Sequence, residues 1–184
     1  MHVVGSVIAR LGSKRLAYKN ILPFAGQPML GIGIETLKRA ATVDQVVVST
    51  GSELIARVAH DFGVDVLRRP DELAGDDVAS VPVFQHIVEH YPCDVHVNLN
   101  VNFPTCSEEV VNKAVEVALQ YEESLSRPCA VWAQTYQRLM YYGDPFTITA
   151  EIFDDKRAGA IDVHTEEELL EVYRIRQGAI KEWE

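Results

Sequence analysis

The sequence predicts an α/β protein in which a mostly parallel β-sheet lies between two layers of helices, a three-layer αβα sandwich. Short apolar β-branched runs alternate along the chain with segments of helical periodicity, the order typical of β-α-β units. The runs are continuously apolar, as in strands buried on both faces. No linker-like tract or internal repeat divides the 184 residues, so we expect one domain over residues 1–184.

The first β-α unit opens the chain. Val3–Ile8 is an apolar β-branched run that predicts the first strand. A polar loop over residues 9–26 follows, and the next helix is expected to open near Pro28, because a missing N–H costs nothing at a first helical position. Gly31 and Gly33 fall inside this helical pattern, which indicates close helix packing.

The remaining elements continue the alternation. Further strands are expected at residues 45–49, 64–67, 94–99 and 129–134, with helices at 81–90 and 107–121. Two more helices are each expected behind a Thr-x-x-Glu capping box, formed by Thr50 with Glu53 and by Thr165 with Glu168. Ligands bind at the carboxyl ends of parallel strands. This rule selects four loops: 9–20, 50–53, 100–105 and the segment after the fifth strand.

Composition excludes several classes of protein. The formal net charge of −10 at pH 7 argues against nucleic-acid or membrane partners, because both require an excess of Lys and Arg. Cys93, Cys106 and Cys129 form neither a disulfide framework nor a metal-binding pair. The chain has no apolar run of about 18 residues and no signal-peptide pattern, so we expect a cytoplasmic protein.

The loop after the first strand carries a local excess of positive charge. Four cations lie within a short stretch that contains no acid: Arg10, Lys14, Arg15 and Lys19. Gly12 and Ser13 allow a tight turn whose N–H groups can face an anion. Fixed cations of this kind suit nucleotidyl transfer, where charge shifts onto the departing pyrophosphate. A solvated basic loop is the alternative interpretation.

The same loop carries a resemblance to a known family. ARLGSKRLAYKN, followed by LPFAGQPML, resembles the opening signature of the CMP-sugar synthetases, the acylneuraminate and 3-deoxy-manno-octulosonate cytidylyltransferases. STGSELIA, RRPDELAGDDVAS and IDVHTEEELLEV resemble later segments of that family. The resemblance implies a divergent and short member, with a Rossmann-like sheet of the nucleotide-diphospho-sugar transferase type. Relatives commonly pair, which suggests a homodimer, although residues 136–155 do not resemble the pairing segment.

The resemblance also implies roles for individual residues. Arg10 and Lys19 would bind the CTP phosphates over the backbone of Leu11, Gly12 and Ser13, and with Asp162 they would form the catalytic set. The remaining nucleotide-binding positions would be Asn20, Arg69, Ala79, Ser80 and Asn100. Asp162 would bind Mg²⁺, with Mn²⁺ as an alternative ion. The implied reaction couples CTP to a small acidic keto-deoxy sugar and releases pyrophosphate.

Four positions depart from the family pattern around the expected metal. Gly51 and His164 stand where relatives carry Asp, Asn102 replaces the acid of the octulosonate branch, and Asn100 replaces a Gln. Mg²⁺ prefers carboxylate oxygens, so these changes weaken its site. The triphosphate could supply most of the ligands instead, or the nearby acid pair Asp154 and Asp155 could replace a missing ligand. Two alternatives therefore stay open: a non-catalytic nucleotide-binding relative, and a nucleotidyltransferase of altered specificity.

Overall fold

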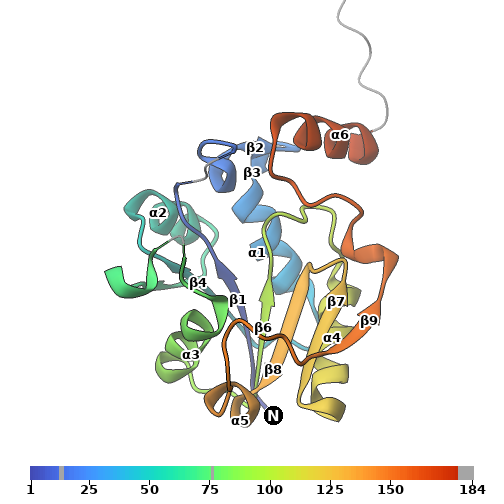
Figure 1. Cartoon of the computed structure of the whole chain (residues 1–184). Helices are drawn as coiled ribbons and strands as arrows, with labels where there is room; N and C mark the ends of the chain where they lie inside the picture. The colour runs from blue at the N-terminus through green and yellow to red at the C-terminus, as the bar shows by residue number, and fades with distance from the viewer. Residues whose placement is uncertain (13–14, 76, 178–184) are drawn as a thin grey trace, which may run out of the picture.

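A computed structural model describes residues 1–12, 15–75 and 77–177 of the chain (Figure 1). The central sheet has seven strands in the order β5-β4-β1-β6-β8-β7-β9. Their bounds are β1 Val3–Ile8, β4 Gln45–Thr50, β5 Asp65–Arg68, β6 Val95–Leu99, β7 Glu123–Arg127, β8 Val131–Thr135 and β9 Glu151–Asp154. The pairs β1–β4, β1–β6, β4–β5 and β7–β9 are parallel, whereas β8 runs antiparallel to both β6 and β7.

Helices cover both faces of this sheet, which confirms the predicted three-layer α/β architecture. The helices are α1 Met29–Arg39, α2 Glu53–Asp61, α3 Ser80–His90, α4 Glu108–Tyr121, α5 Tyr136–Met140 and α6 Glu166–Gln177. Buried side chains of α1, α2 and α4 pack in one hydrophobic cluster with one face of the sheet. Those of α3 and α5 pack in a second cluster on the opposite face. Within the described residues, no helix has the length and apolar character needed to cross a membrane.

The predicted capping boxes have different outcomes. At α6 the prediction is confirmed: the Glu168 N–H donates to Thr165 Oγ1 at 3.3 Å, and the Thr165 N–H donates to Glu168 Oε2 at 2.8 Å. At α2 it is wrong, because Thr50 is the last residue of β4 and the N-cap is Ser52, whose side chain accepts from the Ile55 N–H. The helix expected to open near Pro28 is α1, which begins at Met29 with Pro28 as its N-cap.

The second half of the sheet contains elements that the sequence analysis did not predict. β7 was absent from the predicted strands, and so were β9 and the short α5. The fifth predicted strand corresponds to β8, but this strand is antiparallel to β6. The segment that follows it therefore lies at the edge opposite to the carboxyl ends of β1 and β6, so the expectation that this segment borders the ligand site is wrong.

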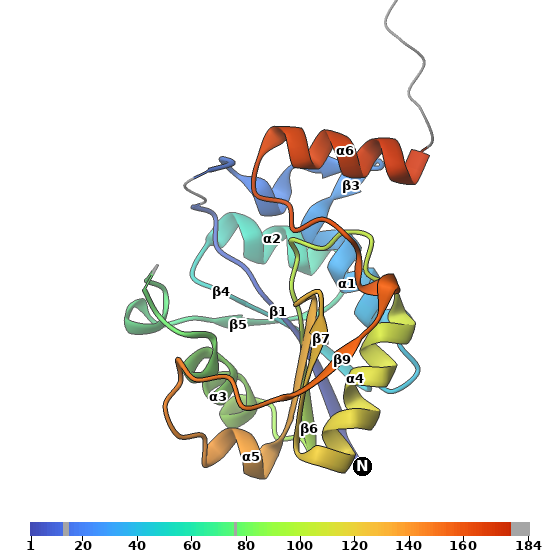
Figure 2. The same ribbon diagram turned by 45° about the vertical axis from the view of Figure 1, so that its right-hand side comes forward.

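The loop after β1 is folded into small elements that α6 covers. It contains a 3₁₀ turn at Lys19–Ile21 and a hairpin of β2 Pro23–Phe24 and β3 Gln27–Pro28. The Tyr173 ring of α6 packs 4.6 Å from the Phe24 ring, and its hydroxyl donates to the Pro23 carbonyl oxygen at 2.8 Å. Figure 2 shows α6 lying across this hairpin. The C-terminal helix thus holds the basic loop against the body of the protein.

Candidate active site

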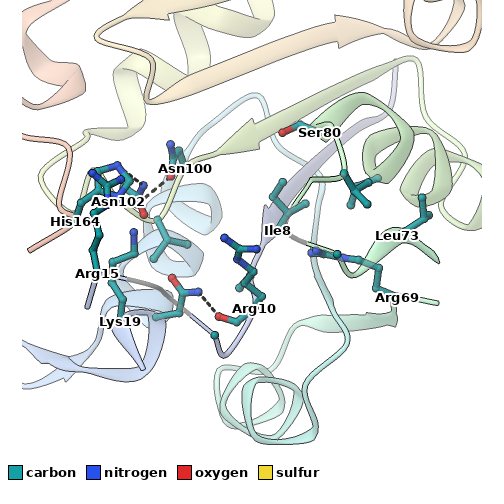
Figure 3. A pocket seen from close by; sticks show the side chains of 17 residues that line it. Ile8, Arg10, Arg15, Lys19, Arg69, Leu73, Ser80, Asn100, Asn102 and His164 are labelled. Atoms are coloured by element: carbon teal, nitrogen blue, oxygen red, sulfur yellow. Dashed lines mark hydrogen bonds between the residues drawn. The ribbon is translucent and has the colours of Figure 1, made fainter. Parts of the chain in front are cut away.

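A cavity of about 400 Å³ lies at the carboxyl ends of β1, β5 and β6 (Figure 3). Its walls come from the loop after β1, the segment between β5 and α3, the loop after β6, and His164 just before α6. Two of the four loops that the sequence analysis selected, 9–20 and 100–105, contribute to it. Residues 50–53 do not line it. The segment between β5 and α3, which the rule did not select, lines the cavity in their place.

The charge of the cavity is opposite to that of the chain. Its described lining residues include four cations and no carboxylate: Arg10, Arg15, Lys19 and Arg69. Figure 3 shows Arg10 and Arg69 toward one side, and Arg15, Lys19 and His164 toward the other. In a protein of net charge −10, this separation of charge suits the cavity to an anion that carries several charges.

The predicted residues of the first loop lie in different environments. Gly12 and Asn20 line the cavity, and the Asn20 amide donates to the Arg10 carbonyl oxygen at 2.7 Å, which closes the loop. Leu11 is not among the lining residues and packs against the hydrophobic core. Ser13 lies outside the described residues. Arg15, which belongs to the basic cluster seen in the sequence but received no individual role from the family resemblance, lines the cavity as well.

Lys19 is the most buried of the four cations, with 7% of its surface exposed. Its Nζ donates to the Val163 carbonyl oxygen at 3.0 Å. The pKa of this amine is lowered to about 8, chiefly by burial; Asp162 opposes the shift, and Arg15 and Arg10 add to it. Because burial and two like charges destabilise the ammonium form, a bound phosphate would gain more here than at an exposed lysine.

Arg69 is fixed by the neighbouring strand. Its Nη2 donates to the Ser49 carbonyl oxygen at 2.7 Å and its Nε to Ser49 Oγ at 3.3 Å. Burial and the nearby Arg10 lower its pKa to about 10, so the guanidinium keeps its charge at neutral pH. A partly desolvated guanidinium with a fixed orientation is suited to bind phosphate or a polar base edge.

A polar chain leads from the loop after β6 to the expected metal position. Asn100 Oδ1 accepts from the Asn102 N–H at 3.1 Å, and Asn102 Nδ2 lies 3.4 Å from His164 Nε2. His164 Nε2 lies 2.9 Å from Asp162 Oδ1. The Asp162 carboxylate is about half exposed and lies beside the cavity rather than among its lining residues.

The described residues near Asp162 fit Mg²⁺ as part of a ligand set that a nucleotide would complete. Among the described residues, no group of three or more His, Cys, Asp or Glu side chains is arranged to hold a metal ion. Asp162 and His164 offer one carboxylate and one imidazole, and Mg²⁺ commonly takes its other ligands from phosphates and water. We expected that Asp154 and Asp155 could replace a missing metal ligand. For Asp155 this expectation is wrong, because its carboxylate binds the Arg157 guanidinium at 2.8 Å.

A second cavity, of about 270 Å³, adjoins the first. The two share Ile8, Ser80 and Asn100 as lining residues, so Ser80 and Asn100 face the junction between them. Ala79 is the N-cap of α3 and lines neither cavity. The sequence analysis missed Asn98 and Trp132, which line the second cavity, because polar residues within a strand give no local signal that they face a cavity.

Comparison with known proteins identifies the family. A family model described as cytidylyltransferase matches residues 4–170, so the chain belongs to this family. The chain is 35% identical over 89 residues to an N-acylneuraminate cytidylyltransferase of Escherichia coli O18:K1:H7 (strain RS218 / NMEC), a match covering 48% of the chain. The matched segment is only 21% of that relative's length.

Solved structures agree on the fold. A CMP:2-keto-3-deoxy-manno-octonic acid synthetase complexed with CTP superposes with a TM-score of 0.81 at 16% identity, over 96% of this chain and 99% of that one. Rv0371C of Mycobacterium tuberculosis H37Rv, in a complex with manganese, gives a TM-score of 0.67 at 17% identity, over 95% and 99% of the two chains. At these identities the likeness shows the architecture alone.

Proposed function

We propose that this chain is a cytidylyltransferase that transfers CMP from CTP to a small acidic keto-deoxy sugar and releases pyrophosphate. The observation that carries the proposal is the cavity with four cations and no carboxylate among its described lining residues. The family and the CTP complex of a structural neighbour support the choice of nucleotide. We further propose that residues 1–184 act as one domain, in the cytoplasm, with a homodimer as the assembly.

The chemistry requires the site to neutralise charge on the leaving group. The anomeric hydroxyl of the sugar loses its proton and attacks the α-phosphorus, while the bond from this phosphorus to the bridging oxygen breaks and pyrophosphate leaves. Arg10 and Lys19 would bind the triphosphate over the Leu11–Gly12 backbone, and Arg69 would bind the nucleotide from the opposite wall. Because hydrogen bonds fix Lys19 and Arg69 before reaction, these two groups stabilise the developing charge with little reorganisation.

The proposed metal position is Asp162, with His164 beside it. A bound Mg²⁺ or Mn²⁺ would supply further neutralisation of the phosphate oxygens. Asp162 also lies close enough to Lys19 to raise the pKa of its amine. Within the proposal, Asp162 thus both contributes an oxygen ligand and keeps the neighbouring ammonium charged.

Pyrophosphate release from CTP tests the proposal. The reaction is measured with Mg²⁺ or Mn²⁺ and a panel of sialic, legionaminic, pseudaminic and octulosonic acids, with CTP binding followed by calorimetry in parallel. Turnover with any acid supports the synthetase. Absence of CTP binding contradicts it.

A second candidate function rests on the metal position. Among the described residues, no group of three or more His, Cys, Asp or Glu side chains gathers there, which favours a relative that binds the nucleotide without turning it over. CTP binding without pyrophosphate release across the panel would support this candidate. Equal thermal stabilisation by CTP, UTP and GTP would instead favour a nucleotidyltransferase of altered specificity.

A further inference from the structure

A row of polar side chains crosses the interior of the sheet next to the second cavity. Ser6 on β1 lies opposite Asn98 on β6 in the parallel ladder, and His96 lies on the same face of β6. Ser6 Oγ lies 2.8 Å from His96 Nε2 and donates to Asn98 Oδ1 at 3.2 Å. Ser6 and His96 have no exposed surface, and Asn98 is 7% exposed. Buried polar groups of this kind hold one another in fixed orientations.

The number of hydrogens available decides which residue of each pair in this row is the donor. Burial lowers the pKa of the His96 imidazole to about 4, so the ring is neutral at pH 7 and carries one N–H. The single Ser6 hydroxyl hydrogen is used toward Asn98 Oδ1, so His96 must donate from Nε2 to Ser6 Oγ. The row then runs from His96 through Ser6 to Asn98.

Gln134 can maintain that tautomer of His96. The two residues face each other across the β6–β8 ladder. His96 Nδ1 and both polar atoms of the Gln134 side chain are buried without a hydrogen-bond partner in the described structure. A Gln134 N–H turned toward Nδ1 would keep the ring proton on Nε2. The Gln134 carbonyl oxygen at the same place would instead raise the pKa of His96 and keep the proton on Nδ1, so the orientation of this amide decides the tautomer.

The direction of the row leaves one donor facing the second cavity. Asn98 lines this cavity, and its Oδ1 is used by Ser6, so Nδ2 is the atom available to a ligand. The described lining residues of the cavity are all uncharged, and Trp132 and Phe84 contribute aromatic surface. Such a cavity suits the hydroxyl and carbonyl groups of a sugar, whereas a carboxylate would be favoured beside the cations of the first cavity.

We propose that Asn98 determines acceptor specificity by donating a hydrogen bond from Nδ2 to a hydroxyl or carbonyl oxygen of the sugar in the second cavity. Ser6 and His96 are positioning residues that orient the Asn98 amide. The inference rests on the proposed transfer of CMP to a sugar, and it assigns the hydroxylated part of that sugar to a cavity adjoining the nucleotide site.

The direction of the row is tested on the wild-type protein by nitrogen NMR of histidine-labelled protein. His96 is identified by the signal that the His96→Gln variant lacks. The expected result is a neutral ring at pH 7 with the proton on Nε2. A proton on Nδ1 would place the Asn98 amide in the opposite orientation and overturn the proposal. This measurement requires no activity and no altered fold.

The role of Asn98 is tested by acceptor kinetics. Asn98→Asp keeps the side-chain shape but replaces the donor, so the KM for the acceptor, N-acetylneuraminic acid or 3-deoxy-manno-octulosonic acid, should rise about tenfold or more. The KM for CTP should stay unchanged. Ser6→Ala should raise only the acceptor KM, by a smaller factor, because the Asn98 amide can then rotate. Asn112→Asp is the matched control, since Asn112 Oδ1 only accepts hydrogen bonds from Thr42.

Three outcomes separate this inference from the proposed function. A wild-type protein that binds no CTP in calorimetry overturns the proposed function itself. A protein that binds CTP but transfers CMP to neither sugar overturns the assignment of the second cavity to such an acceptor. Transfer with an acceptor KM that is the same in wild type and Asn98→Asp overturns the role of Asn98 alone.

Discussion

Lys19 Nζ donates to the carbonyl oxygen of Val163 at 3.0 Å, across 144 residues of sequence. This contact joins the loop after β1 to the segment before α6, and it places the amine beside Asp162 and among Arg10 and Arg15. The lysine therefore connects two parts of the proposed site. Its pKa of about 8 follows from that position, because burial and two like charges outweigh the carboxylates of Asp162 and Glu168.

The first prediction concerns proton uptake at Lys19. If the bound triphosphate requires the ammonium form, CTP binding at pH 8 should take up about half a proton, since a group at its pKa is half protonated. CTP affinity should then fall as pH rises above 8. Calorimetry in buffers of different ionisation enthalpy measures the uptake. Lys19→Arg, which stays charged, is the control, and uptake that is the same in both proteins would exclude Lys19 as its source.

The same pKa predicts the effect of Lys19 on stability. Between pH 8 and 10.5 the unfolded chain binds a proton at this residue and the folded chain does not. The free energy of unfolding should therefore increase as pH rises through this window. Below pH 8 both states bind the proton, and the cost of burying the ammonium group destabilises the folded protein in full. Urea denaturation of wild type and Lys19→Met across the window tests the sign. A stability of wild type relative to Lys19→Met that falls as pH rises through the window would contradict it.

The second prediction concerns the phosphate contacts. Arg10→Ala should lower CTP affinity by about 10- to 100-fold, because it removes a charge-assisted contact worth roughly 1.5–3 kcal/mol. Lys19→Ala should do the same. The control is Arg57→Ala, which removes a cation of α2 whose exposed side chain pairs with Glu53 away from the cavity. Calorimetry provides the affinities, and unchanged binding in both site variants would refute the proposed phosphate site.

The third prediction concerns Mg²⁺. Asp162→Asn keeps an oxygen beside His164 but removes the carboxylate, so the Mg²⁺ concentration for half-maximal activity should rise at least about tenfold. His164→Asp adds a carboxylate at the same place and should lower that concentration. Pyrophosphate release against Mg²⁺ concentration measures both. An Mg²⁺ response that Asp162→Asn leaves unaltered would move the metal elsewhere.

The first half of the fold was predictable because its elements are encoded locally. β1 and β4 are rich in valine, and each is followed along the chain by a segment of helical periodicity. β7, in contrast, has the sequence ESLSR, and its Glu123 is 2% exposed. That carboxylate accepts hydrogen bonds from four residues beyond its own strand: Trp132, Arg138, Tyr142 and Thr149. No local pattern shows such a strand, because long-range contacts stabilise it.

The candidate site also contains residues that could be predicted from the sequence and residues that could not. Arg10 and Lys19 were predictable because cations without neighbouring acids stand out in an acidic chain. Asn98 was not predictable, because a single polar residue within an apolar strand carries no sign of a role in the sequence. Its role becomes visible only with its partner Ser6 on β1. Its alignment with Ser6 depends on the register of β1 and β6, which are separated by about half the chain. Sequence reasoning therefore reached the proposed nucleotide side of the site but not the second cavity.

The last prediction compares the two glycines of α1. A Cβ at Gly31 would collide with the ring of Phe62, so Gly31→Ala should destabilise the protein by about 1–3 kcal/mol through overpacking. At Gly33 the nearest atoms would lie 3.8 Å away, an ordinary contact. Gly33→Ala should therefore be neutral or stabilise by up to about 1 kcal/mol, because alanine favours the helix. Urea denaturation measures both changes.

Phe62→Leu serves as the diagnostic second substitution. If the collision causes the loss, Gly31→Ala should cost less in the Phe62→Leu background than in wild type, since the ring that it meets is gone. Equal costs in the two backgrounds would show that the ring is not the cause. Equal effects of Gly31→Ala and Gly33→Ala would show that helix propensity alone decides, and that α1 does not need a glycine to approach Phe62.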